Sequence, residues 1–185
     1  LEAAKNLNLK KFIQISTDEV FGSIEKGSFT EESSFAPNSP YAASKAGGDH
    51  LCRAYFSTYH TPVVVTHSCN FYGSHQYPEK IIPLFVTNLL KGKKVPLYGD
   101  GKNVRDWLYV EDHGEAIWMI LNKGIAGETY NIGGECEKQN IEIVREICSV
   151  LEMLCPIRDN PALRTRNSEL RTYQDLITFV TDRPG

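Results

Sequence analysis

Short apolar runs alternate along the chain with segments whose apolar residues recur every three or four positions. The runs predict buried strands, and the longer spacing predicts amphipathic helices. Strands are expected at residues 12–16, 62–67, 95–98, 107–110, 129–132 and 176–180. Helices are expected at residues 1–8, 39–59, 79–91, 112–122 and 141–151. Residues 155–175 have no clear period and receive no assignment. Alternating strands and helices indicate an α/β fold with a mostly parallel sheet.

Polar side chains follow two of the predicted strands. Thr17, Asp18 and Glu19 come directly after the first apolar run, and Asn70 and Tyr72 follow the second. In open α/β sheets, ligands bind at the carboxyl ends of the strands. We therefore expect a site at this edge of the sheet. As bare patterns, the same residues would more often be turn caps and solvated turns.

The helix that begins at Ser39-Pro40 carries a Tyr-x-x-x-Lys pair, Tyr41 and Lys45. Residues four apart lie on one helix face, one turn from each other. A fixed ammonium favours the ionised form of a neighbouring phenol, which can then act as a base. Alone, the pattern is also typical of an ordinary surface pair.

Composition narrows the possible functions. The 185 residues are 41% hydrophobic and 23% charged, with a net charge of -3, so we expect neither nucleic acid nor a membrane as partner. No apolar run reaches the roughly 20 residues of a membrane span. The five scattered cysteines form no Cys-x-x-Cys pair, so we expect no metal site, reduced thiols and a cytoplasmic location.

Several longer strings occur in order, and together they are more specific than any one of them. They are Ser-Thr-Asp-Glu-Val-Phe-Gly from Ser16, Pro-Tyr-Ala-Ala-Ser-Lys-Ala from Pro40, Asn-Phe-Tyr-Gly from Asn70, Pro-Glu-Lys-Ile-Ile-Pro from Pro78, Arg-Asp-Trp-Leu-Tyr-Val-Glu-Asp-His from Arg105 and Tyr-Asn-Ile-Gly-Gly from Tyr130. This set resembles the dTDP-glucose 4,6-dehydratase family of extended short-chain dehydrogenases/reductases.

The resemblance implies a fold, a cofactor and a reaction. The fold would be the C-terminal part of a doubly wound, Rossmann-like domain at 1–75, with a smaller substrate-binding region at 76–185 interleaved with the last Rossmann elements at about 107–134. The cofactor would be NAD. The reaction would convert dTDP-glucose to dTDP-4-keto-6-deoxyglucose by oxidation at C4, loss of water across C5 and C6, and hydride return to C6. A homodimer is expected for the full-length form.

The same resemblance assigns the catalytic residues. Tyr41, supported by Lys45, would take the C4 hydroxyl proton, and Thr17 would hydrogen-bond the C4 oxygen. Asp18 would be the acid and Glu19 the base of the elimination, since two carboxyls in different environments can divide these roles. An epimerase relative typically lacks this acidic pair, which makes Asp18 the most discriminating residue of the chain.

Further residues match binding positions of the family. NAD contacts are expected from Ser16, Tyr41, Lys45 and Phe71, and Phe71 stands where the family often has Asn. Contacts to the nucleotide sugar are expected from Thr17, Asn70, Lys80, Ile81, Pro96, Leu97, Tyr98, Arg105 and Asn140. Arg105 suits a diphosphate best, because a guanidinium fork matches phosphate oxygens.

The glycine-rich loop that holds the NAD pyrophosphate in this family has no counterpart in the sequence. Gly99-x-Gly101 has Val104 where a third glycine should be. We therefore expect a fragment that lacks both ends of the family fold, binds NAD weakly and has doubtful activity alone. Three alternatives stay open: a UDP-sugar substrate, a related decarboxylase or epimerase, and an inactive remnant that binds a nucleotide sugar.

Overall fold

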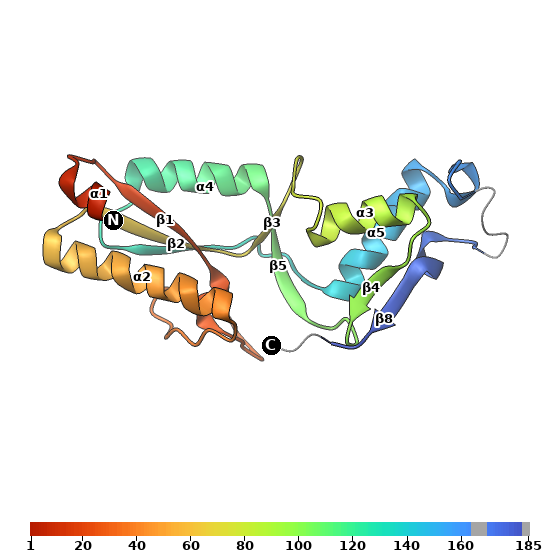
Figure 1. The fold of residues 1–185 in the computed structure, drawn as a ribbon, viewed down its shortest axis with the longest axis horizontal. Helices are drawn as coiled ribbons and strands as arrows, with labels where there is room; N and C mark the ends of the chain where they lie inside the picture. Colours follow the sequence, from red (N-terminus) through yellow and green to blue (C-terminus); the bar gives the residue numbers. More distant parts are fainter. Residues whose placement is uncertain (164–169, 183–185) are drawn as a thin grey trace. The chain divides into compact units, whose positions relative to one another are not determined.

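The computed structural model of the chain describes residues 1–163 and 170–182 (Figure 1). The chain divides into two compact units. Of the described residues, unit 1 contains 1–71 and 106–135, and unit 2 contains 72–105, 136–163 and 170–182. The predicted α/β class with parallel pairing is confirmed, because strands alternate with helices and the pairs β1–β2, β2–β6 and β4–β8 are parallel.

Unit 1 is built on a parallel sheet of order β1-β2-β6. Its strands are β1 (Phe12–Thr17), β2 (Val63–Ser68) and β6 (Thr129–Ile132), and its main helices are α2 (Pro40–Tyr59) and α4 (Val110–Lys123). A short helix, α1 (Glu2–Asn6), precedes β1, and a 3-10 turn, η1 (Asp18–Phe21), follows it. The described residues contain a second three-stranded sheet, which is not confined to unit 1. It has the order β3-β5-β7 and is formed by β3 (Asn70–Tyr72), β5 (Val104–Tyr109) and β7 (Glu137–Gln139).

The central strand β2 is buried along its whole length, which explains its unbroken apolar run. Successive side chains of a strand point to opposite faces. Val63 and Val65 accordingly pack with Cys52 of α2, whereas Val64 packs with Ile120 of α4. The two helices lie on opposite sides of the sheet (Figure 1).

Unit 2 packs two helices on a two-stranded parallel sheet. Its elements are α3 (Ile81–Leu90), β4 (Val95–Tyr98), α5 (Asn140–Leu154), the short turns η2 (Ile157–Asp159) and η3 (Tyr173–Leu176), and β8 (Ile177–Val180). One apolar core joins them, with Leu89, Val95, Val144 and Tyr173 fully buried.

Some elements differ from the sequence prediction. β5 begins at Val104, three residues before the predicted strand, and Val110 opens α4 instead of ending the strand. Neither β3 nor β7 was predicted, because strands of three residues are too short to show a period of two. The turns η1, η2 and η3 were not predicted either.

Candidate active site

The carboxyl ends of the three strands of unit 1 lie level with one another. In the parallel register, Thr17 of β1 pairs with Ser68 of β2, and Ser68 pairs with Ile132 of β6. The residues that follow each strand therefore leave the sheet at the same edge. The Thr17–Glu19 and Asn70–Phe71 stretches, predicted from separate motifs, both belong to unit 1 and both follow this edge.

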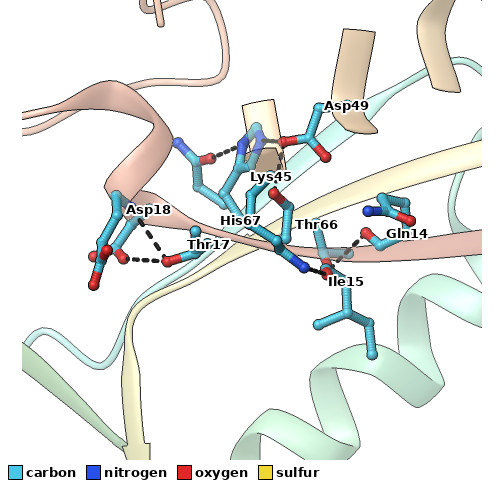
Figure 2. Close-up of polar contacts among 11 residues, drawn as sticks. Gln14, Ile15, Thr17, Asp18, Lys45, Asp49, Thr66 and His67 are labelled. Carbon is cyan, nitrogen blue, oxygen red and sulfur yellow. Dashed lines mark hydrogen bonds and ion pairs between the residues drawn. The ribbon is translucent and has the colours of Figure 1, made fainter. Parts of the chain in front are cut away.

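A tight turn fixes the two carboxylates after β1. The Thr17 hydroxyl accepts a hydrogen bond from the Glu19 amide at 3.3 Å and donates to Asp18 Oδ1 at 3.2 Å (Figure 2). The turn ends at Gly22, whose φ is 85° and where a Cβ would lie 2.3 Å from the Ala36 carbonyl oxygen. This cap leaves Asp18 half-buried and Glu19 exposed, so the adjacent carboxyls have different surroundings.

Helix α2 starts as predicted and presents Tyr41 and Lys45. Ser39 caps it by accepting a hydrogen bond from the Ala42 amide at 3.1 Å. Tyr41 is 57% exposed in the first turn. One turn later, Lys45 Nζ donates to the Ile15 carbonyl at 2.6 Å (Figure 2). The lysine ammonium is thus held at β1, two residues before Thr17, by a charge-assisted hydrogen bond.

A buried polar group beneath this edge was not identified from the sequence. Asp49 Oδ2 accepts a hydrogen bond from the Ser16 hydroxyl at 2.6 Å and pairs with His67 Nε2 at 3.2 Å. His67 Nδ1 lies 3.2 Å from Asn131 Oδ1. The spacing could have revealed Asp49, because it follows Lys45 by four residues and Tyr41 by eight on the same helix.

The end of β2 is organised around His113 of α4. Ser68 Oγ and His113 Nε2 are 2.8 Å apart, and the Phe71 ring stacks on the imidazole with centroids 4.5 Å apart. Burial lowers the pKa of His113, which favours the neutral ring. Burial, with the nearby Asp106 carboxylate, raises the pKa of the Cys69 thiol to about 12, so Cys69 is a poor nucleophile.

Asp106 also forms a hydrogen bond just beyond the end of β6. Its Oδ2 accepts a hydrogen bond from the Gly134 amide at 2.7 Å. A Cβ at Gly134 would lie 2.1 Å from the Trp107 carbonyl oxygen, so only glycine allows this approach. The Arg-Asp string therefore contributes its carboxylate to unit 1, while the preceding Arg105 belongs to unit 2.

The remaining predicted binding residues, from Lys80 to Asn140, belong to unit 2. In β4 the side chains of Pro96 and Tyr98 are half-buried and alternate with the buried Leu97. The other predicted residues lie at the ends of elements or beside them. Lys80 occupies the N-cap position of α3 without a capping hydrogen bond from its side chain, and Ile81 packs against the core. Arg105 is exposed, and the Asn140 amide donates to the Asn103 carbonyl at 3.0 Å.

A cavity of about 1080 Å³ also occurs within unit 1. It is lined by residues 30–35, by α2, by β2 and by the start of β6. Asp49 and His67 reach its wall, but Thr17, Asp18 and Tyr41 do not line it. The described residues contain no group of three or more His, Cys, Asp or Glu side chains arranged to hold a metal. Within the same residues, no helix is both long and apolar enough to cross a membrane.

Comparison with known proteins supports the resemblance noted from the sequence. The family model described as GDP-mannose 4,6 dehydratase matches residues 1–175. The dTDP-glucose 4,6-dehydratase of Haemophilus influenzae is 49% identical over all of this chain and 53% of its own length. Among solved structures, the Bacillus anthracis dTDP-glucose 4,6-dehydratase in complex with NAD is 50% identical, with a TM-score of 0.80 over 94% of this chain and 50% of that one.

DesIV, a dTDP-glucose 4,6-dehydratase from Streptomyces venezuelae solved with NAD bound, gives a TM-score of 0.84 at 44% identity, over 98% of this chain and 51% of that one. The chain thus spans about half the length of the curated relatives it matches. With a family model matched over residues 1–175 and relatives about half identical over the whole chain, the chain belongs to the nucleotide-sugar dehydratase family described by the GDP-mannose 4,6 dehydratase model.

Proposed function

We propose that the protein carrying this sequence is an NAD-dependent nucleotide-sugar 4,6-dehydratase that converts dTDP-glucose to dTDP-4-keto-6-deoxyglucose. One observation carries the proposal: Thr17, Asp18 and Glu19 follow β1 at the level edge of a parallel sheet, and Lys45 of the adjoining helix is bonded to the same strand. The identity of about 50% to enzymes of that name supports the choice of reaction.

Tyr41 is proposed as the base of the first step. Its exposed phenol lies in the first turn of α2, which packs against β1 and η1. Tyr41 would take the proton of the C4 hydroxyl, and Lys45 would favour the charge that develops on the phenol. Thr17 would hold the C4 oxygen by a hydrogen bond, which requires its hydroxyl to turn from Asp18 toward the sugar.

Asp18 and Glu19 are proposed to remove water across C5 and C6. Glu19 would take the C5 proton, and Asp18 would protonate the C6 hydroxyl as it leaves as water. Glu19 would return its proton to C5 when C6 is reduced. The half-buried Asp18, bonded to Thr17, and the exposed Glu19 have the unequal surroundings that such a division of roles needs.

The residues at the strand ends fit one part of NAD. NAD would accept hydride from C4 and return it to C6. Tyr41, Lys45 and Phe71 would lie beside its nicotinamide half, and Ser16 would contribute through its backbone, because its hydroxyl is buried on Asp49. The pyrophosphate half is not matched, since the 185 residues contain no Gly-x-Gly-x-x-Gly string.

Binding residues are proposed for each unit separately. Unit 1 would carry the chemistry and, with Asn70, part of the sugar contacts. Unit 2 would bind the diphosphate and base, through exposed side chains such as Arg105 and Lys80 and through the backbone of the buried Leu97. We also propose a cytoplasmic homodimer in the full-length form. The exposed apolar side chains of α2, Leu51 and Tyr59, support a partner surface on that helix.

The test replaces Asp18 by Asn in the full-length protein. Loss of the acid should lower the rate of dehydrated product formation by about 100-fold or more, as general acids typically contribute. Glu25→Gln, an exposed carboxylate in the following loop, is the control and should keep the wild-type rate. An unchanged rate in Asp18→Asn would exclude the acid assignment. Parallel assays with dTDP-glucose and UDP-glucose decide which nucleotide base the enzyme accepts. An epimerised product without loss of water would favour an epimerase.

A further inference from the structure

Helix α2 is attached to β1 at two adjacent residues. Lys45 Nζ donates to the Ile15 carbonyl at 2.6 Å (Figure 2). The Ser16 hydroxyl donates to Asp49 Oδ2 at 2.6 Å. Both attachment points directly precede Thr17. Because α2 carries Tyr41 and the end of β1 carries the two carboxylates, these bonds set the distance between the two halves of the candidate site.

The second attachment is part of a buried network across four elements. The Asp49 network consists of Ser16 of β1, Asp49 of α2, His67 of β2 and Asn131 of β6. Asp49 is 4% exposed and His67 is 2% exposed. A buried carboxylate is costly unless hydrogen bonds compensate it. Asp49 Oδ2 receives two such contacts, whereas the buried Oδ1 has no hydrogen-bond partner among the described residues, so Ser16 and His67 supply all the compensation seen. The Phe21 and Phe35 rings meet the His67 ring edge-on and restrict its movement.

Packing of α2 on the sheet does not require this network. Cys52, one turn after Asp49, already contacts Val63 and Val65 through apolar surface. The network instead joins the helix to Ser16, the residue before Thr17. Its attachment point on α2, Asp49, lies nearer along the helix to Tyr41 than Cys52 does. A polar, directional bond fixes position more closely than apolar contact, which tolerates small displacements.

We propose that Asp49 is a positioning residue for catalysis: through Ser16, and with His67 bonded to the same carboxylate oxygen, it fixes the relative position of Tyr41 on α2 and of Thr17, Asp18 and Glu19 after β1. This inference rests on the proposed function, and it adds two residues, Asp49 and His67, to which that function assigns no contact with the substrate.

The first experiment is Asp49→Asn in the full-length protein. Asparagine keeps the shape and replaces the charge-assisted hydrogen bonds to Ser16 and His67 by weaker neutral ones. We expect kcat to fall by about 10- to 100-fold, with KM changed less than about threefold, because misalignment affects the reacting groups more than substrate binding. Cys52→Ala is the matched control, since it weakens a buried contact of the same helix away from β1. If Cys52→Ala and Asp49→Asn lose the same thermal stability, Cys52→Ala should still keep the wild-type kcat.

Two further variants test the route through Ser16. Ser16→Ala removes the attachment while leaving Asp49 and His67 in place, and it remains informative if Asp49→Asn folds poorly. The Ser16→Ala/Asp49→Asn double variant should lose little more kcat than either single variant, because both break one connection. Multiplied losses in the double variant, or an Asp49→Asn kcat equal to that of Cys52→Ala, would overturn the proposal.

A readout without turnover separates this inference from the proposed function. If the wild-type protein is inactive on every nucleotide sugar, the proposed function fails, and amide hydrogen exchange then decides the inference. Asp49→Asn should raise the exchange rates of the Ser16 and Thr17 amides in β1 more than Cys52→Ala does. Equal exchange in the two variants would show that Asp49 does not hold the end of β1.

Discussion

Tyr173 offers a quantitative test of how unit 2 is held together. Its side chain is fully buried, and its hydroxyl donates to the Cys155 carbonyl at 2.9 Å and accepts from Asn160 Nδ2 at 3.0 Å. Asn160 Nδ2 also donates to the Leu90 carbonyl at 2.9 Å. Together with Asn160, the hydroxyl thus connects three segments that are separate in the sequence: the end of α3, the end of α5 and η3.

Tyr173→Phe removes one oxygen and keeps the ring in the core. The Cys155 carbonyl and one Asn160 N–H would each lose a partner. An unsatisfied buried group costs about 1–3 kcal/mol, and Cys155 is only partly buried, so its carbonyl belongs at the low end of that range. We therefore expect a loss of about 2–4 kcal/mol of unfolding free energy for the two groups. A typical domain has about 5–15 kcal/mol in total, so the effect should be large. With a urea m-value of about 2 kcal/mol per M, the middle of the usual range, the unfolding midpoint should fall by roughly 1–2 M.

The assay is equilibrium urea unfolding followed by far-ultraviolet circular dichroism. Tyr77→Phe is the control, because Tyr77 belongs to the same unit and its side chain is 66% exposed. It should leave the midpoint unchanged. If the two variants shift the midpoint equally, with m unchanged, the hydroxyl does not hold these segments together and the reasoning is refuted.

Two further predictions concern pH and cofactor. Burial lowers the pKa of His113, so below about pH 6.5 the unfolded state binds more protons than the folded state, and stability present above that pH should be lost on acidification. Between about pH 7 and pH 5, the thermal unfolding temperature should therefore decrease less in His113→Gln than in the wild type. Equal decreases would exclude this role of His113. The 185 residues contain no glycine-rich pyrophosphate loop, so calorimetric titration of this chain should give an NAD dissociation constant above about 1 mM. Micromolar binding would show that this chain holds the pyrophosphate without such a loop.

Local patterns predicted the elements that carry the candidate site. The apolar run before Thr17 and the Ser39-Pro40 helix start were both correct, because strand burial and helix capping are decided within a few residues. The parallel class also followed from the order of elements. The roles of Asp18, Glu19 and Tyr41 stay predictions, since they depend on a substrate and a cofactor.

Other features are produced by contacts between distant residues. Residues 155–163 and 170–176 show no sequence period because tertiary hydrogen bonds hold them: Asn160 and Tyr173 bond each other, and Glu152 accepts from the Tyr173 and Ile157 amides. In unit 1, the sequence indicated that Tyr41 and Lys45 share a helix face. The structure adds that the Lys45 ammonium is bonded to the Ile15 carbonyl, thirty residues away.

The sequence by itself determined which residues follow the strands and which face of α2 carries the phenol and the ammonium, because the periods of strands and helices are local properties. Only the tertiary structure decided which strand ends lie level, that Ser16 turns its hydroxyl inward to Asp49, and that Asp49 is shared with His67. Partners far apart in the chain are selected by burial, since a carboxylate removed from water must find its hydrogen bonds wherever the fold brings donors.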